Sequence, residues 1–260
     1  MTNVAESPDR FVEERQTLIV ARLQAEGRVS ASDLARELAT SEDTVRRDLR
    51  ALAERGLCRR VYGGAILERA QPVPFPERAG RDSGQKAALA KAALKLVEDS
   101  GFLFLDSGST NLELARALRP TRRRIVATHA PAIALALEGA EPLDVRLLGG
   151  AYNPREGSCL GADALTALDA LRPDLAVLGV CAIDEGSGAC AFDGEDAAFK
   201  RRLVAVSDRV IALVVNDKLG ARAPFVVCPL ERLDAVVLQA DAPDNWAARF
   251  AGAGVAVVRA

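Results

Sequence analysis

Residues 40–64 constrain the fold more strongly than any other part of the sequence, because they read as a helix followed by a short hairpin. Ser41 is a suitable N-cap, two acids follow where the helix dipole favours negative charge, and Gly56 suits the end of a helix. Apolar residues at helical spacing define one face: Val45, Leu49 and Leu52. The segment therefore predicts a helix with one buried and one exposed side.

The exposed side of this helix is rich in arginine. Arg47 and Arg50 point nearly opposite the buried face, and Arg46 lies on its flank. Asp48 falls close to the buried side, where we expect it to hold a neighbouring arginine or a backbone amide. Residues 41–60 carry six arginines against four acids, so this region is locally basic although the whole chain has a net charge of −2.

Two more helices precede this one. The spacing of Ser30 and Asp33 is typical of a capped helix start, and an earlier amphipathic helix ends near Gly27. The apolar residues of the two are, in chain order, Phe11, Leu18, Ile19 and Leu23, then Leu34, Ala35 and Leu38. Residues 10–55 are thus predicted to form three helices, the last two arranged as a helix-turn-helix.

A hairpin completes the pattern. Leu57–Val61 and Ala65–Leu67 flank a Tyr-Gly-Gly turn and predict a β-wing that carries Arg59 and Arg60. A charged helix face can be merely solvated, but three helices and a basic wing favour DNA binding, with the last helix in the major groove. The net negative charge argues against a non-specific coat on nucleic acid, so we expect salt-sensitive, site-specific binding.

Residues 44–65, TVRRDLRALAERGLCRRVYGGA, closely resemble the N-terminal domain of the DeoR family of bacterial transcriptional regulators. The resemblance implies a winged helix that binds operator DNA and a sensor domain that binds a phosphorylated sugar or related metabolite. Family members are mostly repressors of carbohydrate or nucleoside catabolic genes. The residues expected at the major groove are Ser41, Thr44, Arg46, Arg47 and Arg50, and those expected at flanking phosphate or the minor groove are Arg59 and Arg60. Because one winged helix reads few base pairs, we expect a homo-oligomer, either a dimer or a tetramer.

The length of 260 residues allows a small domain and a larger one. We predict a disordered N-terminus at 1–9, a winged helix-turn-helix domain at 10–67, a linker at 68–85 and an effector domain at 86–260. The linker prediction rests on the prolines of Pro72-Val-Pro-Phe-Pro76, which disfavour helices and central strands. No segment reaches the roughly 20 apolar residues of a membrane span, and no signal peptide is recognisable, so a cytoplasmic protein is expected.

The cysteine and histidine content bears on metals and cofactors. The five cysteines are scattered without a C-x-x-C pair and are interpreted as reduced thiols. His129 is the single histidine, which leaves few nitrogen ligands for zinc. We expect neither a metal nor a cofactor.

From Lys86 onwards, short apolar runs alternate with helical patterns. Strands are predicted at Phe102–Leu105, Ile125–Ala127, Val145–Leu148, Leu175–Val180, Val210–Val215, Ala235–Leu238 and Val255–Val258. Helices are predicted at Ala87–Val97, Leu112–Leu118, Ala130–Leu137 and Glu195–Ser207. This alternation is typical of an α/β domain with a mainly parallel sheet, in which ligands bind beyond the carboxyl ends of the strands.

The first of these strand ends reads Asp106-Ser107-Gly108-Ser109-Thr110 and opens a helix. Such residues at a helix N-terminus expose backbone N–H groups that suit a phosphate, although a capped turn without a ligand would have the same sequence pattern. Other strand ends carry Thr128-His129, Gly149-Gly150, Arg155 with Gly161, Asp184 with Gly188, and Lys218. Together they predict a pocket for a small anionic polyol, with Asp184 at hydroxyl groups and Lys200 or Lys218 at phosphate.

This half also resembles the DeoR-type sensor domain, which is similar in fold to ribose-5-phosphate isomerase and CoA transferases. The similar stretches are FLDSGSTNLELARAL, LLGGAYNPREGSCLGADAL and EDAAFKRRLVAVSDRVIALVVNDKLG. The resemblance places at the ligand pocket Asp106, Gly108, Ser109, Thr110, Gly149, Gly150, Gly161, Asp184, Gly188, Glu195, Lys200 and Lys218. The chain departs from the family pattern at His129, where asparagine is common, and at Asn216-Asp217-Lys218. His129 either contacts the ligand or forms a hydrogen-bonded pocket wall.

Two functions of different classes follow from these patterns. The first is an effector-controlled transcription factor, which is not an enzyme. The second is a sugar-phosphate isomerase or a transferase that carries a DNA-binding appendage, with Asp184, Glu195 and Lys200 as acid–base groups. The N-terminal domain favours the first.

Overall fold

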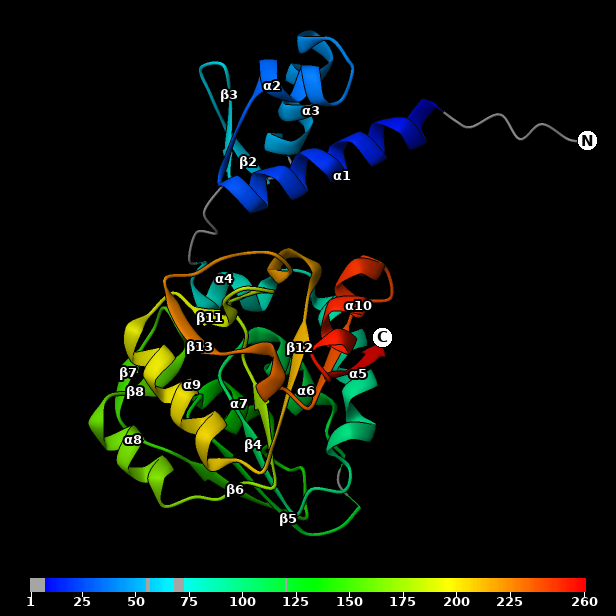
Figure 1. The fold of residues 1–260 in the computed structure, drawn as a ribbon. Helices are drawn as coiled ribbons and strands as arrows, with labels where there is room; N and C mark the ends of the chain where they lie inside the picture. The colour runs from blue at the N-terminus through cyan, green and yellow to red at the C-terminus, as the bar shows by residue number, and fades with distance from the viewer. Residues whose placement is uncertain (1–7, 55–56, 68–72, 120) are drawn as a thin grey trace, which may run out of the picture. The chain divides into compact units, whose positions relative to one another are not determined.

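A computed structural model describes residues 8–54, 57–67, 73–119 and 121–260. The chain divides into two compact units, Met1–Arg69 and Ala70–Ala260, shown in Figure 1. Within the described ranges, no helix is long and apolar enough to cross a membrane. The predictions made for residues 1–7 and for Gly56 lie outside these ranges.

The N-terminal unit is a winged helix-turn-helix. Its elements are α1 (Pro8–Glu26), β1 (Arg28–Ser30), α2 (Ala31–Glu37), α3 (Glu42–Glu54), β2 (Cys58–Val61) and β3 (Gly64–Leu67). The three predicted helices and the predicted hairpin are confirmed. The hairpin gains a third strand that was not predicted, because β1 pairs with β3 in an antiparallel sheet of order β1-β3-β2. Helix α1 begins at Pro8, inside the segment predicted as disordered.

The helix caps and most core residues of this unit are those predicted from the sequence. The Ser41 hydroxyl accepts the Thr44 N–H at 3.2 Å, and the Ser30 hydroxyl accepts the Asp33 N–H at 3.4 Å, so both predicted caps form. The core contains the predicted apolar residues Ile19, Leu23, Leu34, Val45, Leu49 and Leu52. Leu18 was also assigned to the buried face of its helix, and this is wrong, because it lies one residue beyond the buried stripe and is 57% exposed.

The larger unit is built on a seven-stranded sheet in the order β15-β14-β12-β9-β4-β5-β6, with every neighbouring pair parallel. The strands are β4 (Phe102–Leu105), β5 (Arg124–Thr128), β6 (Leu143–Leu147), β9 (Leu175–Leu178), β12 (Arg209–Val214), β14 (Ala235–Leu238) and β15 (Ala256–Arg259). All seven correspond to predicted strands, and the parallel α/β prediction is confirmed. They read as apolar runs because helices cover both faces.

Helices α5 (Ser83–Val97), α6 (Ser109–Ala117) and α7 (Pro131–Ala136) pack on one face of the sheet, and α8 (Ala162–Asp169), α9 (Gly194–Val206) and α10 (Asp244–Gly252) pack on the other. Figure 1 shows α5 and α6 on the side opposite α8 and α9. Successive residues of β4 serve different cores, since Leu103 and Leu105 join the first layer and Phe104 joins the second.

Several elements were not predicted from the sequence. A hairpin joins β7 (Ala151–Asn153) to β8 (Ser158–Leu160), and a small antiparallel sheet contains β10 (Ala182–Asp184), β11 (Gly188–Ala191) and β13 (Phe225–Cys228). The prediction that no helix runs through residues 68–85 is wrong. Helix α4 (Phe75–Gly80) lies there, and α5 begins at Ser83. Proline is compatible with the first turn of α4, where its missing N–H would have no helical partner.

Candidate functional site

Helix α3 of the N-terminal unit presents three exposed arginines. Arg46 pairs with Glu42 at 2.8 Å and with Asp43 at 3.5 Å. Arg47 and Arg50 are exposed and have no ion-pair partner among the residues that the structure describes. The Ser41 and Thr44 hydroxyls are hydrogen-bonded to each other at 2.9 Å at the start of the helix. This surface offers two free guanidinium groups to a phosphate or a base edge.

Asp48 lies beneath this surface and not on it. It is 4% exposed, and its carboxylate accepts hydrogen bonds from the Arg15 guanidinium, with Nε at 2.5 Å from Oδ2. Hydrogen bonding to Asp48 raises the pKa of Arg15 further, against the opposing effect of burial. The prediction that Asp48 holds a neighbouring arginine is confirmed, and the pair ties α3 to α1.

The wing carries Arg59 and Arg60 on β2, both exposed. Because successive strand residues point to opposite faces, the two arginines lie on different sides of the ribbon. Tyr62 stands fully exposed at the tip, beside Gly63 at φ +78°. Tyr62 was not among the residues predicted at DNA, although an aromatic residue beside a Gly-Gly turn and two arginines is a signal for such a surface.

The main pocket of the larger unit lies where the sheet changes direction. From β4, the chain adds β5 and β6 on one side and β9, β12, β14 and β15 on the other. The loops after β4, β9 and β12 therefore meet at the carboxyl ends of adjacent strands, which is the usual place for a ligand in an open parallel sheet. The lining includes Ser107–Asn111, Gly179–Cys181, Val215, Asp217 and Lys218.

The loop after β4 delivers free backbone N–H groups to this pocket. Gly108 has φ +142°, which favours glycine, and no side chain of the described residues caps the N-terminus of α6. Ser109 and Thr110 occupy the first turn, where the helix dipole favours an anion. Gly179 allows the neighbouring loop to approach, because a Cβ at this position would lie 2.0 Å from the Ser107 carbonyl oxygen.

A buried charged network supports this loop from below. Asp106 is fully buried, and its carboxylate accepts the N–H groups of Ser107 at 2.8 Å and Gly179 at 2.7 Å. Lys200 Nζ lies 3.2 Å from Asp106 Oδ2 and 2.5 Å from Asp196 Oδ1. The network joins the loops after β4 and β9 to helix α9, and it fixes the geometry of the α6 N-terminus.

The pKa values in the network reflect this pairing. Burial opposes ionisation of Asp106, but Lys200 and His129 outweigh it and hold the pKa of Asp106 below its usual value. Burial disfavours the charged Lys200, yet Asp106 and Asp196 together raise its pKa. Burial raises the pKa of Asp196, whose Oδ2 has no hydrogen-bond partner among the described residues.

His129 belongs to the network and does not reach the pocket. It is fully buried, with Nε2 at 2.9 Å from Asp106 Oδ1 and Nδ1 at 2.9 Å from the Cys159 carbonyl oxygen. Its ring stacks on Phe199 with centroids 3.9 Å apart. The structure therefore favours the second of the two alternatives, in which His129 is a hydrogen-bonded wall.

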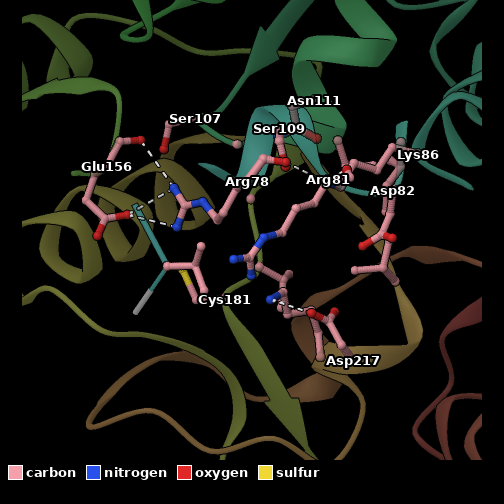
Figure 2. Close-up of a pocket in the computed structure, with 18 of the residues that line it drawn as sticks. Arg78, Arg81, Asp82, Lys86, Ser107, Ser109, Asn111, Glu156, Cys181 and Asp217 are labelled. Atoms are coloured by element: carbon pink, nitrogen blue, oxygen red, sulfur yellow. Dashed lines mark hydrogen bonds and ion pairs between the residues drawn. The ribbon is translucent and has the colours of Figure 1, made fainter. Parts of the chain in front are cut away.

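The pocket is lined by more positive than negative side chains. The cationic residues are Arg78, Arg81, Lys86, Lys200 and Lys218, and the acidic ones are Asp82, Glu156 and Asp217. In Figure 2, Arg78 extends toward Glu156 on one side of the pocket. In this view, Arg81 lies between Arg78 and Asp217. Arg78, Arg81 and Lys86 were not predicted at the pocket, because they lie within or next to the segment that was predicted to be a linker.

The predicted effector residues divide into three groups. Six line the pocket: Ser107, Gly108, Ser109, Thr110, Lys200 and Lys218. Three lie buried below it or beside it: Asp106, Thr128 and His129. The others do not line it: Gly149, Gly150, Arg155, Gly161, Asp184, Gly188 and Glu195.

Asp184 and the predicted glycines shape turns away from the pocket lining. The Asp184 carboxylate accepts the N–H groups of Gly186 and Ser187 and a hydrogen bond from Arg222 at 3.2 Å, which orders the turn between β10 and β11. Gly150 and Gly188 have positive φ, and a Cβ would meet backbone oxygens at 2.5 and 2.2 Å respectively. Glycine is therefore needed at both positions because a side chain would collide with the backbone, and a ligand is not required to explain it.

Glu156, Cys181 and Asp196 place potential metal-ligand atoms within 4.8 Å of one another. Arg78 already lies 3.4 Å from Glu156, and Lys200 lies 2.5 Å from Asp196, so a cation would compete with two positive side chains for these carboxylates. Burial raises the pKa of Cys181 to about 11, which keeps it a neutral thiol near pH 7. The two carboxylates of this group are therefore already paired with cationic side chains.

Known protein families match both units. Residues 15–71 match the DeoR-like helix-turn-helix domain, and residues 81–240 match the DeoR C terminal sensor domain. The putative aga operon transcriptional repressor of Escherichia coli O157:H7 is 29% identical over 99% of this chain and 98% of its own length. The glycerol-3-phosphate regulon repressor of Escherichia coli K12 is 28% identical over 88% of this chain and 92% of its own length.

Solved structures give weaker likenesses. Ribose 5 phosphate isomerase A from Neisseria gonorrhoeae has a TM-score of 0.39 and 12% identity, covering 54% of this chain and 55% of its own. The two matched domains, a DeoR-like helix-turn-helix and a DeoR C terminal sensor, are those of a transcriptional regulator with a sensor domain. The chain belongs to the DeoR family of transcriptional regulators.

Proposed function

We propose that this protein is a repressor of carbohydrate or nucleoside catabolic genes, and that a phosphorylated sugar or polyol bound in the larger unit releases or modulates it. The observation that carries the proposal is the pocket at the start of α6. There, uncapped backbone N–H groups lie among side chains with an excess of positive charge. The relative named as a glycerol-3-phosphate regulon repressor supports an effector of this kind.

Operator binding is assigned to α3 and the wing. Arg47 and Arg50 have no ion-pair partner within the described ranges, so they can meet DNA without first breaking a salt bridge. A helix-turn-helix reads only a short half-site, so we propose a homo-oligomer that binds two half-sites related by symmetry. The effector then binds one conformation of the oligomer more tightly and changes its affinity for DNA.

The proposed function needs no cofactor and no catalysis. Two of the three acidic side chains that line the pocket are paired: Glu156 pairs with Arg78 at 3.4 Å, and Asp217 pairs with Lys218 at 3.1 Å. Glu195, one of the acid–base candidates of the isomerase or transferase alternative, does not line the pocket. Turnover of ribose 5-phosphate by the purified protein would favour that alternative.

A thermal-shift panel tests the effector class. Phosphorylated sugars and polyols are compared with their unphosphorylated forms on the full chain. A compound at about a hundred times its dissociation constant adds nearly 3 kcal/mol of stability. Stabilisation by a phosphorylated compound but not by its free sugar is expected. An equal response to both forms, or no response to any, would contradict the phosphate assignment.

A further inference from the structure

Helix α4 lies between the two ranges that match known families, at 15–71 and 81–240. It is the first helix of the larger unit, which begins at Ala70, so it directly follows the DNA-binding unit in the chain. It also supplies Arg78 to the pocket, and Arg81 follows at its C-cap. One short helix therefore connects the pocket lining with the start of the larger unit.

The backbone of α4 is fastened to the rest of the larger unit. The Phe75 N–H donates to the Arg155 carbonyl oxygen at 2.7 Å. The Phe75 ring lies so close to Gly157 that a Cβ there would be 2.5 Å from it. Lys86 Nζ donates to the carbonyl oxygens of Arg78 at 2.6 Å and Arg81 at 2.5 Å, which satisfies the C-terminal end of α4.

The Arg81 side chain is held less firmly than this backbone. Arg81 contacts Glu77 at 3.2 Å, and both side chains of this pair are more than half exposed, so water and salt weaken the pair. Arg78 is held better, because it is only 17% exposed and donates to both the carboxylate and the main-chain carbonyl oxygen of Glu156 at 3.4 Å. Asp82, directly after Arg81, has φ +52°, a left-handed conformation that is uncommon for a residue with a side chain.

We propose that Arg81 is a specificity-determining contact for the anionic group of the effector, and that this contact ties α4 to the pocket when the effector is bound. The proposal rests on the function proposed above and adds the residue that binds the anion and the helix of the larger unit that responds to it. An anion at the α6 N-terminus attracts the exposed Arg81 away from Glu77, because a guanidinium binds a phosphate through two parallel hydrogen bonds. Occupancy of the pocket thereby strengthens the attachment of α4.

The first experiment titrates the full chain with inorganic phosphate and with glycerol 3-phosphate at constant ionic strength and follows its thermal midpoint. Arg81→Ala is expected to weaken both affinities about tenfold, since it removes a charge-assisted contact. Arg81→Lys keeps the charge and should recover part of the loss. Arg146→Ala is the matched control, because Arg146 is an exposed arginine of the same unit that does not line the pocket.

The second experiment measures hydrogen exchange of residues 75–82 in the full chain with and without the bound probe. The wild type should show slower exchange when the probe is bound, and Arg81→Ala should lose this protection even at probe concentrations that saturate it. If Arg81→Ala binds both probes like the wild type, the inference is wrong and the proposed function stands. If neither probe, nor any phosphorylated compound, binds the wild type, both are wrong. If Arg81→Ala weakens binding but the bound probe does not slow hydrogen exchange of residues 75–82 in the wild type, Arg81 contacts the anion without tying α4 to the pocket, and that part of the inference is wrong.

Discussion

At the scale of single residues, the groups that order the pocket are distinct from those that line it. Asp106 and His129 follow predicted strands, which made them candidate ligand contacts, yet both are fully buried. Sequence position identifies a strand end but not whether a side chain points outward or back beneath the loop. Arg81, in contrast, was not a candidate but lines the pocket, because it follows a helix in a segment where proline had predicted none.

Substitution of Arg47 tests the DNA surface. Arg47→Ala should weaken binding to a DNA site selected by the wild type, by about 1–3 kcal/mol if the arginine contacts a base. The residue is exposed and has no ion-pair partner among the described residues, so the unfolding midpoint should not change. Fluorescence anisotropy measures the affinity, with Arg146→Ala as the control. If Arg47→Ala binds the DNA as tightly as the wild type, Arg47 does not contact DNA.

Acid sensitivity tests the buried network. Because the folded pKa of Asp106 lies below its usual 3.8, its ionised form stabilises the folded state above that pH, and this contribution is lost as the pH falls through the folded pKa. Asp106→Asn should cost about 3 kcal/mol near pH 7, since it leaves Lys200 with one carboxylate fewer. The difference in unfolding free energy from the wild type should narrow below about pH 3.8. Urea unfolding at several pH values measures this difference in free energy. A difference that does not vary with pH would contradict a stabilising, ionised Asp106 in the folded state.

At the scale of elements, the strands of the main sheet were predictable and the short elements were not. Apolar runs such as Phe102–Leu105 form strands because the sheet is covered on both faces. Strands β7 and β10 have only three residues each, too few for a periodic pattern. Helix α4 was missed because proline was read as a helix breaker, although the first helical turn accepts it.

The contact between the loops after β4 and β9 is an element-scale prediction. Gly179→Ala places a Cβ 2.0 Å from the Ser107 carbonyl oxygen, so it should destabilise the fold by about 1–3 kcal/mol and weaken phosphate binding at the displaced loop. Gly149→Ala is the matched control, because Gly149 also lies outside helices and strands and no described atom lies within 4 Å of the added Cβ. Chemical denaturation compares the two variants. If Gly179→Ala is as stable as the wild type, the loops after β4 and β9 are not in close contact.

At the scale of the whole molecule, the proposed function requires more than one copy of the chain. Light scattering should give a mass that is a multiple of 27.5 kDa at micromolar concentration. This expectation follows from the short half-site that one helix-turn-helix can read. A monomer that still binds selected DNA with full affinity would contradict it.

The most direct test of the account is whether the pocket and the DNA surface are linked. The compound that stabilises the full chain most in the thermal-shift panel is added at saturation, and the affinity for selected DNA is measured with and without it. We expect DNA affinity to change about tenfold, and the affinity for the compound to change by the same factor when DNA is bound, because coupling is reciprocal. Identical DNA affinity in the presence of the saturating compound would show that the pocket does not control DNA binding.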